Sequence, residues 1–237
     1  MTLKTYREKR NFKTSPEPAG KNAPSAKSAG IYVIQKHRAS QLHYDFRLEY
    51  GGTLRSWAVP KGPSLDPSVK RLAMQVEDHP VEYARFEGVI PEGEYGGGTV
   101  MVWDKGTWTP EGEDIGEALK KGDLKFTLKG KKLHGSWVLV RTKGYGHNAD
   151  RSWLLIKHRD RYASQQDITT LQPKSAISGR LLADIARENG GDVAKAATGD
   201  SQPSPPTKTS RPSTKRRKPQ PRPNQPSTRP VTAKNNK

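Results

Sequence analysis

The stretch 42-LHYDFRLEYGGTLRSWAVP-60 contains two runs in which apolar and polar residues alternate, and a pair of glycines joins them. Alternation with a period of two is typical of β-strands that bury one face. A Gly-Gly pair between two such runs favours a tight hairpin turn. The stretch therefore predicts an antiparallel hairpin in which Leu42, Tyr44, Phe46 and Leu48 face the core.

Similar strand-like runs continue on both sides of this hairpin. They are GIYVIQKH (30–37), RLAMQVEDH (71–79), GGGTVMVWD (96–104), LKFTLKG (124–130), LHGSWVLVRT (133–142) and RSWLLIKH (151–158). Gly and Lys-Gly turns separate many of these runs. Seven or eight short strands between about residues 31 and 157 predict a mostly antiparallel sandwich or a small barrel.

Two segments have the pattern of short helices. The segment EDIGEALKKGD (113–123) ends near Gly122, a residue suited to the C-terminus of a helix. The segment SAISGRLLADIARENGG (175–191) has a fitting stop at Gly190. In this second segment one helical face would carry Ile177, Leu181, Leu182 and Ile185.

Positive charge is concentrated at the C-terminus of the 237-residue chain. Residues 201–237 contain 10 Lys and Arg, nine prolines and no acidic residue, so they carry ten of the formal +18 charges and leave +8 for residues 1–200. Such a segment buries too little apolar surface to offset its ordering entropy, so we expect a disordered tail. Its KRRK run at 215–218 indicates either a non-specific nucleic-acid tether or a solubilising tail.

Composition excludes several classes of protein and site. The chain has no cysteine, which excludes disulfides and thiolate metal sites. No apolar run approaches the roughly 20 residues needed to span a bilayer, and the N-terminus has no apolar core of a secretory signal. We therefore expect a soluble, cytoplasmic protein without a membrane partner.

The polar face of the first predicted strand has two interpretations. His43, Asp45, Arg47 and Glu49 share this face, which could be a solvent-exposed side with one or two salt bridges. His37, six residues before His43, could also fold back beside it. Two imidazoles and a carboxylate suit Mn²⁺, Zn²⁺ or Fe²⁺ better than Mg²⁺ or Ca²⁺, so a metal site is the alternative.

A second alternating run carries matching chemistry. In residues 71–79, Arg71 and His79 share one parity with Gln75 and Glu77. If its polar face joins that of the first strand, Arg47, Arg71 and His79 would surround one phosphate-binding spot. Lys61, on a Gly/Pro loop, would either add a positive charge there or be simply solvated.

Several longer motifs, in order, resemble one known family. They are QKHRASQLHYDFRLE (35–49), SWAVPKGPS (56–64), RLAMQVEDHPVEYARFEGVIPEGEYGGGTV (71–100) and WDKGTW (103–108), with YREKRNFKTSPEPAG (6–20) before them. From about residue 4 to 162, the chain resembles the 3′-phosphoesterase domain of bacterial DNA ligase D. It looks like a stand-alone member, without the ligase and polymerase domains that often accompany this domain.

The resemblance implies a small antiparallel β-barrel with short flanking helices and a Mn²⁺-dependent enzyme, with other divalent transition metals as alternatives. Such an enzyme trims a 3′-terminal ribonucleotide to leave a 3′-phosphate and then hydrolyses that monoester to a 3′-OH. The implied metal ligands are His37, His43 and Asp45, and the implied phosphate ligands are Arg47, Lys61, Arg71 and His79. His79 is also the candidate general acid. Gln35 and Tyr83 match supporting positions, and Arg10 and Glu17 match positions tied to the diesterase step and to the terminal ribose.

These expectations divide the chain into an arm that contributes to the site (1–30), a phosphoesterase barrel (31–162), a linker with an amphipathic helix (163–200) and the tail (201–237). The expected partners are DNA 3′ ends during non-homologous end joining, with a separate ligase or polymerase and end-binding repair factors, in the cytoplasm at the nucleoid. Two alternatives are a non-catalytic module that binds nucleic-acid ends and a broader metal-dependent RNA or DNA end phosphatase.

Overall fold

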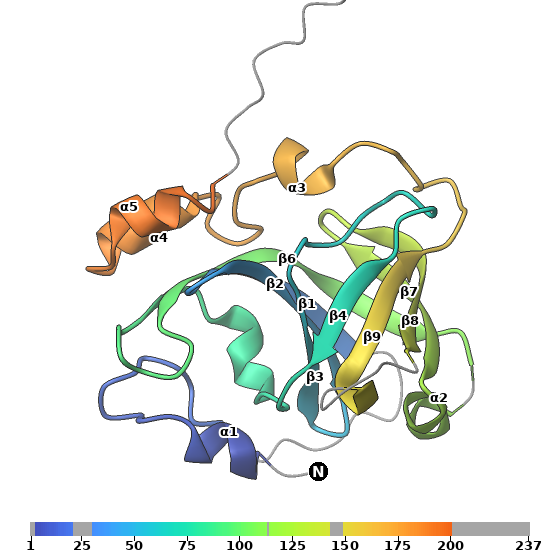
Figure 1. Ribbon diagram of the computed structural model, residues 1–237, viewed down its shortest axis with the longest axis horizontal. Coiled ribbons are helices and arrows are strands. Elements are labelled where there is room, and N and C mark those ends of the chain that lie inside the picture. The colour runs from blue at the N-terminus through green and yellow to red at the C-terminus, as the bar shows by residue number, and fades with distance from the viewer. Residues whose placement is uncertain (1–2, 21–29, 113, 143–148, 201–237) are drawn as a thin grey trace, which may run out of the picture. The chain divides into compact units, whose positions relative to one another are not determined.

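The predicted hairpin is part of a sheet that closes on itself. The computed structural model describes residues 3–20, 30–112, 114–142 and 149–200. Within these residues the strands are β1 (Gly30–Arg38), β2 (Leu42–Tyr50), β3 (Thr53–Val59), β4 (Arg71–Gln75), β5 (Gly88–Ile90), β6 (Gly98–Pro110), β7 (Asp123–Gly130), β8 (His134–Arg141) and β9 (Ser152–Lys157). The strand order is β1-β2-β3-β4-β9-β8-β7-β6, and β6 pairs with β1 to close an antiparallel barrel (Figure 1). The barrel prediction is confirmed; the short β5, which pairs with β6 outside the closed ring, was not predicted.

Local sequence explains the tight turn of the first hairpin. Gly51 and Gly52 adopt φ angles of 67° and 75°, which only glycine reaches readily at both turn positions. The apolar face of β2 packs inside the barrel as predicted, because Tyr44, Phe46 and Leu48 are all buried. The interior also holds the five tryptophans, Trp57, Trp103, Trp108, Trp137 and Trp153.

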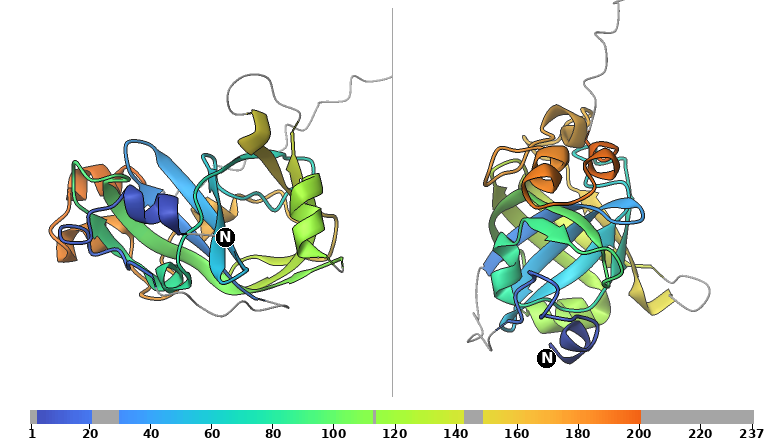
Figure 2. Two further views of the ribbon diagram at one scale, coloured as in Figure 1. Left: turned by 90° about the horizontal axis from the view of Figure 1, so that it is seen from below. Right: turned by 90° about the vertical axis from the view of Figure 1, so that its left-hand side faces the viewer.

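Short helices lie outside the barrel. They are α1 (Lys4–Glu8), η1 (Val81–Arg85), α2 (Ile115–Lys121), η2 (Ala149–Arg151), α3 (Ile168–Leu171), α4 (Leu182–Glu188) and α5 (Val193–Ala197). The α2 prediction is confirmed: Asp114 caps its N-terminus by accepting a hydrogen bond from the Glu117 amide, and Gly122 ends it in the left-handed region at φ 81°. Figures 1 and 2 place α2 and the α4–α5 pair at opposite ends of the barrel. None of the helices in the described residues has the length and apolar character needed to cross a bilayer.

The helix predicted over 175–191 is shorter than its apolar pattern suggested. It begins only at Leu182, because the Ser175 hydroxyl accepts hydrogen bonds from the Ile177 and Ser178 amides and because Gly179 adopts φ 73°. A serine-based turn of this kind competes with helical hydrogen bonds. Ile177 is consequently exposed, whereas Leu182 and Ile185 join the barrel core.

A second apolar cluster lies on the outer surface of the barrel. It combines Leu3 and Tyr6 from the N-terminal arm, which we define as residues 3–20, with Tyr83 and Ala84 of η1 and with Val33, Leu54 and Val102 of the barrel wall. The arm and η1 therefore cover the outward side of β1, β3 and β6. This covering layer buries a barrel face that the sequence alone would place in solvent.

Candidate active site

The register of β1 against β2 brings three predicted metal ligands together. His37 lies directly opposite His43, with ring centroids 4.8 Å apart, and Gln35 lies opposite Asp45. His37, His43 and Asp45 all point outward, because alternate residues of a strand share a face. One ligand atom from each of the three can be chosen so that all lie within 4.8 Å of one another.

The donor atoms of this triad fit a divalent transition metal. Asp45 Oδ2 lies 3.6 Å from His43 Nε2 and 3.8 Å from His37 Nδ1, close to the 3–3.5 Å expected, roughly, between ligand atoms about 2.1 Å from one ion. His43 Nδ1 lies 3.1 Å from the Gln41 carbonyl oxygen. A hydrogen bond from Nδ1 to that oxygen leaves the Nε2 lone pair facing Asp45, the arrangement common for metal-binding histidines.

Charges around the triad favour an ionised carboxylate. Burial alone would raise the pKa of Asp45, but Arg47 and the two histidines hold it well below its usual value. Burial lowers the pKa of His37. Burial also opposes the charged form of His43, yet its contact with Asp45 outweighs this and raises the pKa of His43. A cation bound at the triad would compete with that proton.

Arg47 connects the triad to the rest of the site. Its guanidinium is almost fully buried and contacts Asp45 at 3.1 Å. It donates hydrogen bonds to Gln35 Oε1 at 2.9 Å and to Ser56 Oγ at 2.7 Å. Gln35 is itself held by the carbonyl oxygens of Tyr83 and Phe86, and it lies beside a β-bulge between β1 and β6. The predicted supporting position of Gln35 thus corresponds to a residue that fixes the direction of Arg47.

His79 lies between two arginines. Its Nδ1 is 2.9 Å from Arg47 Nη1, and its Nε2 is 3.2 Å from Arg10 Nη2. Burial and the two positive charges hold the pKa of His79 well below its usual value. The imidazole is therefore neutral at pH 7 in this arrangement and can accept a hydrogen bond from Arg10.

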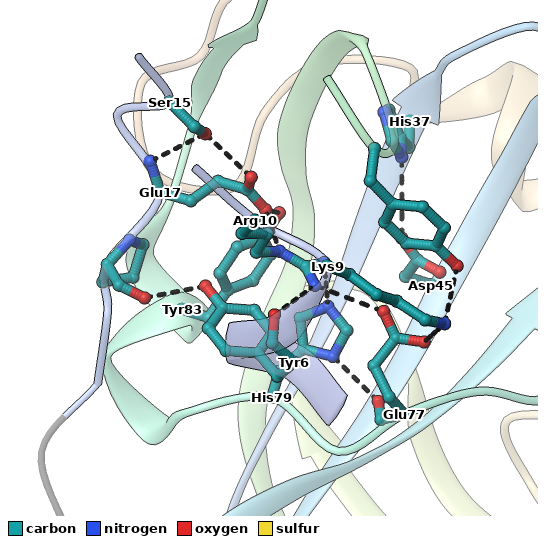
Figure 3. Close-up of polar contacts among 12 residues, drawn as sticks. Tyr6, Lys9, Arg10, Ser15, Glu17, His37, Asp45, Glu77, His79 and Tyr83 are labelled. Carbon is teal, nitrogen blue, oxygen red and sulfur yellow. Dashed lines mark hydrogen bonds and ion pairs between the residues drawn. The ribbon is translucent and has the colours of Figure 1, made fainter. Parts of the chain in front are cut away.

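Two predicted arm residues reach the same cluster from the far end of the sequence. Arg10 Nε donates to Glu17 Oε1 at 2.8 Å, and Tyr83 donates from its hydroxyl to the same oxygen at 2.9 Å. Figure 3 shows Arg10 lying between the Glu17 carboxylate and His79. Because Glu17 is buried and its other oxygen accepts from Ser15, it holds Arg10 in place.

Arg71 and His79 do not lie on one continuous strand. Strand β4 ends at Gln75, so one alternation does not run through to His79. Ala73 and Gln75 face the barrel interior, where Gln75 accepts a hydrogen bond from Trp153, and Arg71 has their parity. Lys61 is exposed in the loop after β3, and in the described part of the chain it forms no hydrogen bond or ion pair. A phosphate-binding role for Lys61 or Arg71 stays a prediction based on the resemblance.

Sequence reasoning missed several residues of the cluster. The Tyr6 ring packs 4.0 Å from the Arg10 guanidinium and 5.0 Å from the His79 ring. Lys9 Nζ contacts both Glu77 and the hydroxyl of Tyr95 at 3.2 Å. No local pattern marks Tyr6, Lys9 or Tyr95, since the contacts of Tyr6 with His79 and of Lys9 with Glu77 and Tyr95 span more than 60 residues of the chain.

Comparisons with known proteins agree with the geometry. Residues 35–141 match the model of the DNA ligase D 3′-phosphoesterase domain. The chain is 53% identical over 185 residues to a protein of Pseudomonas aeruginosa named multifunctional non-homologous end joining protein LigD, covering 76% of this chain and 22% of that protein. It is 40% identical over 163 residues to the LigD protein of Mycolicibacterium smegmatis, covering 67% and 21%. It is 44% identical over 142 residues to that of Mycobacterium bovis, covering 60% and 18%. The chain thus spans about a fifth of the length of these relatives.

Proposed function

Because this chain belongs, through residues 35–141, to the DNA ligase D 3′-phosphoesterase domain family, we propose that it is a hydrolase that heals DNA 3′ ends during non-homologous end joining. The proposed reactions remove a 3′-terminal ribonucleoside to leave a 3′-phosphate and then hydrolyse that phosphate to a 3′-OH. The observation that supports this most strongly is the contact between the His37–His43–Asp45 triad and Arg47. This contact joins a metal-competent donor set to a phosphate-competent cation.

We propose that His37, His43 and Asp45 hold Mn²⁺, with another divalent transition metal as the alternative. Bound there, the ion would polarise a phosphate oxygen and lower the pKa of a water molecule. Three protein ligands leave further coordination positions free. The mixed nitrogen and oxygen donors suit this group of ions.

The positive side chains of the site have an electrostatic role in this proposal. Arg47 and Arg10, on either side of His79, would offset negative charge that develops on the phosphate. Their directions are fixed by Gln35, Ser56 and Glu17. Little reorganisation is then needed when substrate binds, which is what makes such donors effective.

His79 is the proposed general acid for the leaving oxygen. Burial and the two arginines hold the pKa of His79 well below its usual value, which favours the neutral imidazole in the absence of substrate. A phosphate dianion placed against Arg47 and Arg10 would neutralise them and raise the pKa of His79. The imidazole would therefore gain a proton only when substrate is bound, and it would then donate that proton to the leaving oxygen.

A labelled primer annealed to a template and ending in one ribonucleotide tests this function. With Mn²⁺ we expect conversion first to a 3′-phosphate product and then to 3′-OH, and no conversion in EDTA. All-RNA and all-DNA versions distinguish the proposed substrate from that of a broader end phosphatase. A primer that stays intact with every metal but still binds would instead identify a non-catalytic end-binding module.

The variant His43→Ala tests the ligand assignment in the same assay. We expect both steps to slow at least about 1,000-fold, equivalent to about 4 kcal/mol of barrier. The control is His134→Ala, since His134 lies at the start of β8 and stacks on Tyr162 rather than on the triad. Near-normal rates for His43→Ala at the same Mn²⁺ concentration would refute the assignment.

A further inference from the structure

A hollow of about 360 Å³ opens beside the cluster on the side of His79. This volume lies within the range of roughly 300–1,000 Å³ typical of ligand clefts. Arm residues Tyr6 and Lys9 line one part of it, Gln75–Asp78 another, and Arg55, Tyr95 and Arg151 the remainder. Tyr6 packs directly on His79, so the hollow starts one side chain away from the proposed general acid.

The charged side chains that line the hollow, apart from Arg151, are paired with one another or with Arg10, which suits a neutral ligand. Both of its carboxylates are already paired: Glu77 with Lys9 and Arg10, and Asp78 with Arg55 at 3.0 Å. A continuing DNA strand would bring phosphates next to these carboxylates. A nucleoside carries no phosphate and would meet no such repulsion.

Tyr95 gives the hollow an aromatic wall. Its side chain is 48% exposed, although its hydroxyl is bonded to Lys9 Nζ and that ammonium lies 4.5 Å from the ring centroid. The following residue, Gly96, lies against His37, since a Cβ at that position would be 3.7 Å from His37 Cε1. An exposed ring is thus held in a fixed direction between the metal triad and the hollow.

We propose that this hollow receives the 3′-terminal nucleoside that leaves in the first reaction, with its base stacked on Tyr95. This inference rests on the proposed function. In that step water adds to phosphorus and the bond from phosphorus to O5′ of the terminal nucleoside breaks. The water gives up a proton, O5′ takes one, and a 3′-phosphate and a free nucleoside result. If His79 protonates O5′, the nucleoside lies on the side of His79, where the hollow is.

Stacking also predicts how this site selects its ligand. Every base presents a flat π face, so a tyrosine platform accepts all four bases. A base recognised in this way needs no edge-specific hydrogen bonds. The structure therefore assigns Tyr95 to binding of the terminal nucleoside, whichever base that nucleoside carries. The second substrate, a 3′-phosphate end, has no terminal nucleoside for Tyr95 to bind.

The test compares Tyr95→Ala and Tyr95→Trp on three primers, ending in a ribonucleotide, in an abasic ribose or in a 3′-phosphate. For Tyr95→Ala we expect the ratio of kcat/KM on the ribonucleotide end to that on the 3′-phosphate end to fall about tenfold. Tyr95→Trp should restore the ratio, and the abasic end should show no such fall. Tyr162→Ala is the matched control, because Tyr162 is also exposed and packs against an arginine but lies outside the site. A ratio unchanged by Tyr95→Ala, or an equal fall with the abasic end, would overturn the proposal.

A fluorescence measurement separates this inference from the proposed function. A primer ending in 2-aminopurine ribonucleotide is mixed with wild-type protein in EDTA, where no hydrolysis is expected. Stacking on the ring predicts quenching that Tyr95→Trp retains and Tyr95→Ala loses. Equal quenching by wild type and Tyr95→Ala would contradict the platform. If the wild type bound and quenched but hydrolysed neither end with any metal, the enzyme proposal would fail while the platform stood.

Discussion

Arg47 is the residue on which the site depends. It is a nearly buried cation whose contacts extend to Asp45, Gln35, Ser56 and His79. Of these, Asp45 carries the opposite charge and is itself buried. Removing one partner of a buried ion pair lowers the free energy of unfolding much more than removing one partner of an exposed pair, because the remaining buried charge stays uncompensated.

Replacing Arg47 by Met should therefore lower the free energy of unfolding by about 3–5 kcal/mol in metal-free buffer. Added Mn²⁺ should stabilise this variant more than the wild type, because the ion then meets a less compensated Asp45. Denaturant unfolding with and without Mn²⁺ measures both effects. The control Arg55→Met removes a pair with Asp78 outside the triad and should respond to Mn²⁺ as the wild type does. If Mn²⁺ stabilised Arg47→Met and the wild type equally, the result would show that Arg47 is not coupled to the metal site.

Single residues also mark how far the sequence could predict the site. The alternation of β2 was enough to place His43, Asp45 and Arg47 on one face. The position of His37 depends on the register of the hairpin. We expected the chain to fold back and place His37 beside His43, and the pairing of these two residues confirms this. The placement of Arg71 beside His79 stays a prediction, because the strand that carries Arg71 ends at Gln75 and does not extend to His79. The lowered pKa of His79 was not foreseeable, since it depends on burial and on two arginines, one of which comes from the arm.

At the scale of elements, the arm decides which face of the barrel is a site. Its Tyr6 is fully buried and donates a hydrogen bond to the Pro18 carbonyl at 2.7 Å. This bond ties α1 to the segment that carries Glu17. No periodic pattern in residues 3–20 indicates where the arm packs, because its partners are on η1 and the outer barrel wall.

Tyr6→Ala should detach the arm while leaving the barrel folded. Truncating a buried aromatic side chain lowers the free energy of unfolding by about 3–5 kcal/mol when its packing is lost only on global unfolding. If the arm opens locally, the barrel stays folded and the free energy of global unfolding falls by less. Hydrogen exchange is expected to accelerate in residues 3–20 and to stay slow in β6–β9. Tyr6→Phe, which keeps the ring and removes one hydrogen bond, should cost only about 1 kcal/mol. Equal acceleration of the arm and the barrel would show that they unfold together.

At the scale of the whole molecule, barrel closure and charge distribution are separate features. Closure needs the pairing of β1 with β6, which lie about 70 residues apart in the chain. Strand count and turn signals predicted a barrel or a sandwich, and the family resemblance selected the barrel. The excess of positive charge follows from composition alone. Much of it belongs to residues 201–237, which lie outside the described residues.

Truncation after Asp200 tests the role of these residues. It removes ten positive charges, so the dependence of DNA affinity on salt should become shallower by about 0.9 in the log–log slope for each phosphate that the tail no longer neutralises. Hydrolysis at saturating DNA should be unchanged, because the site residues are all retained. Titrations of labelled duplex at several salt concentrations give the slope. An unchanged slope would identify a solubilising tail rather than a tether.

We propose that one metal centre carries both hydrolytic steps. We would titrate Mn²⁺ into metal-free protein and follow a primer ending in one ribonucleotide and a primer ending in a 3′-phosphate in parallel. We expect both rates to rise from zero and to reach half of their maxima at the same free Mn²⁺ concentration, and His43→Ala to shift or abolish both together. Half-saturation at clearly different Mn²⁺ concentrations, or one step that continues without metal, would contradict a single centre built on His37, His43 and Asp45.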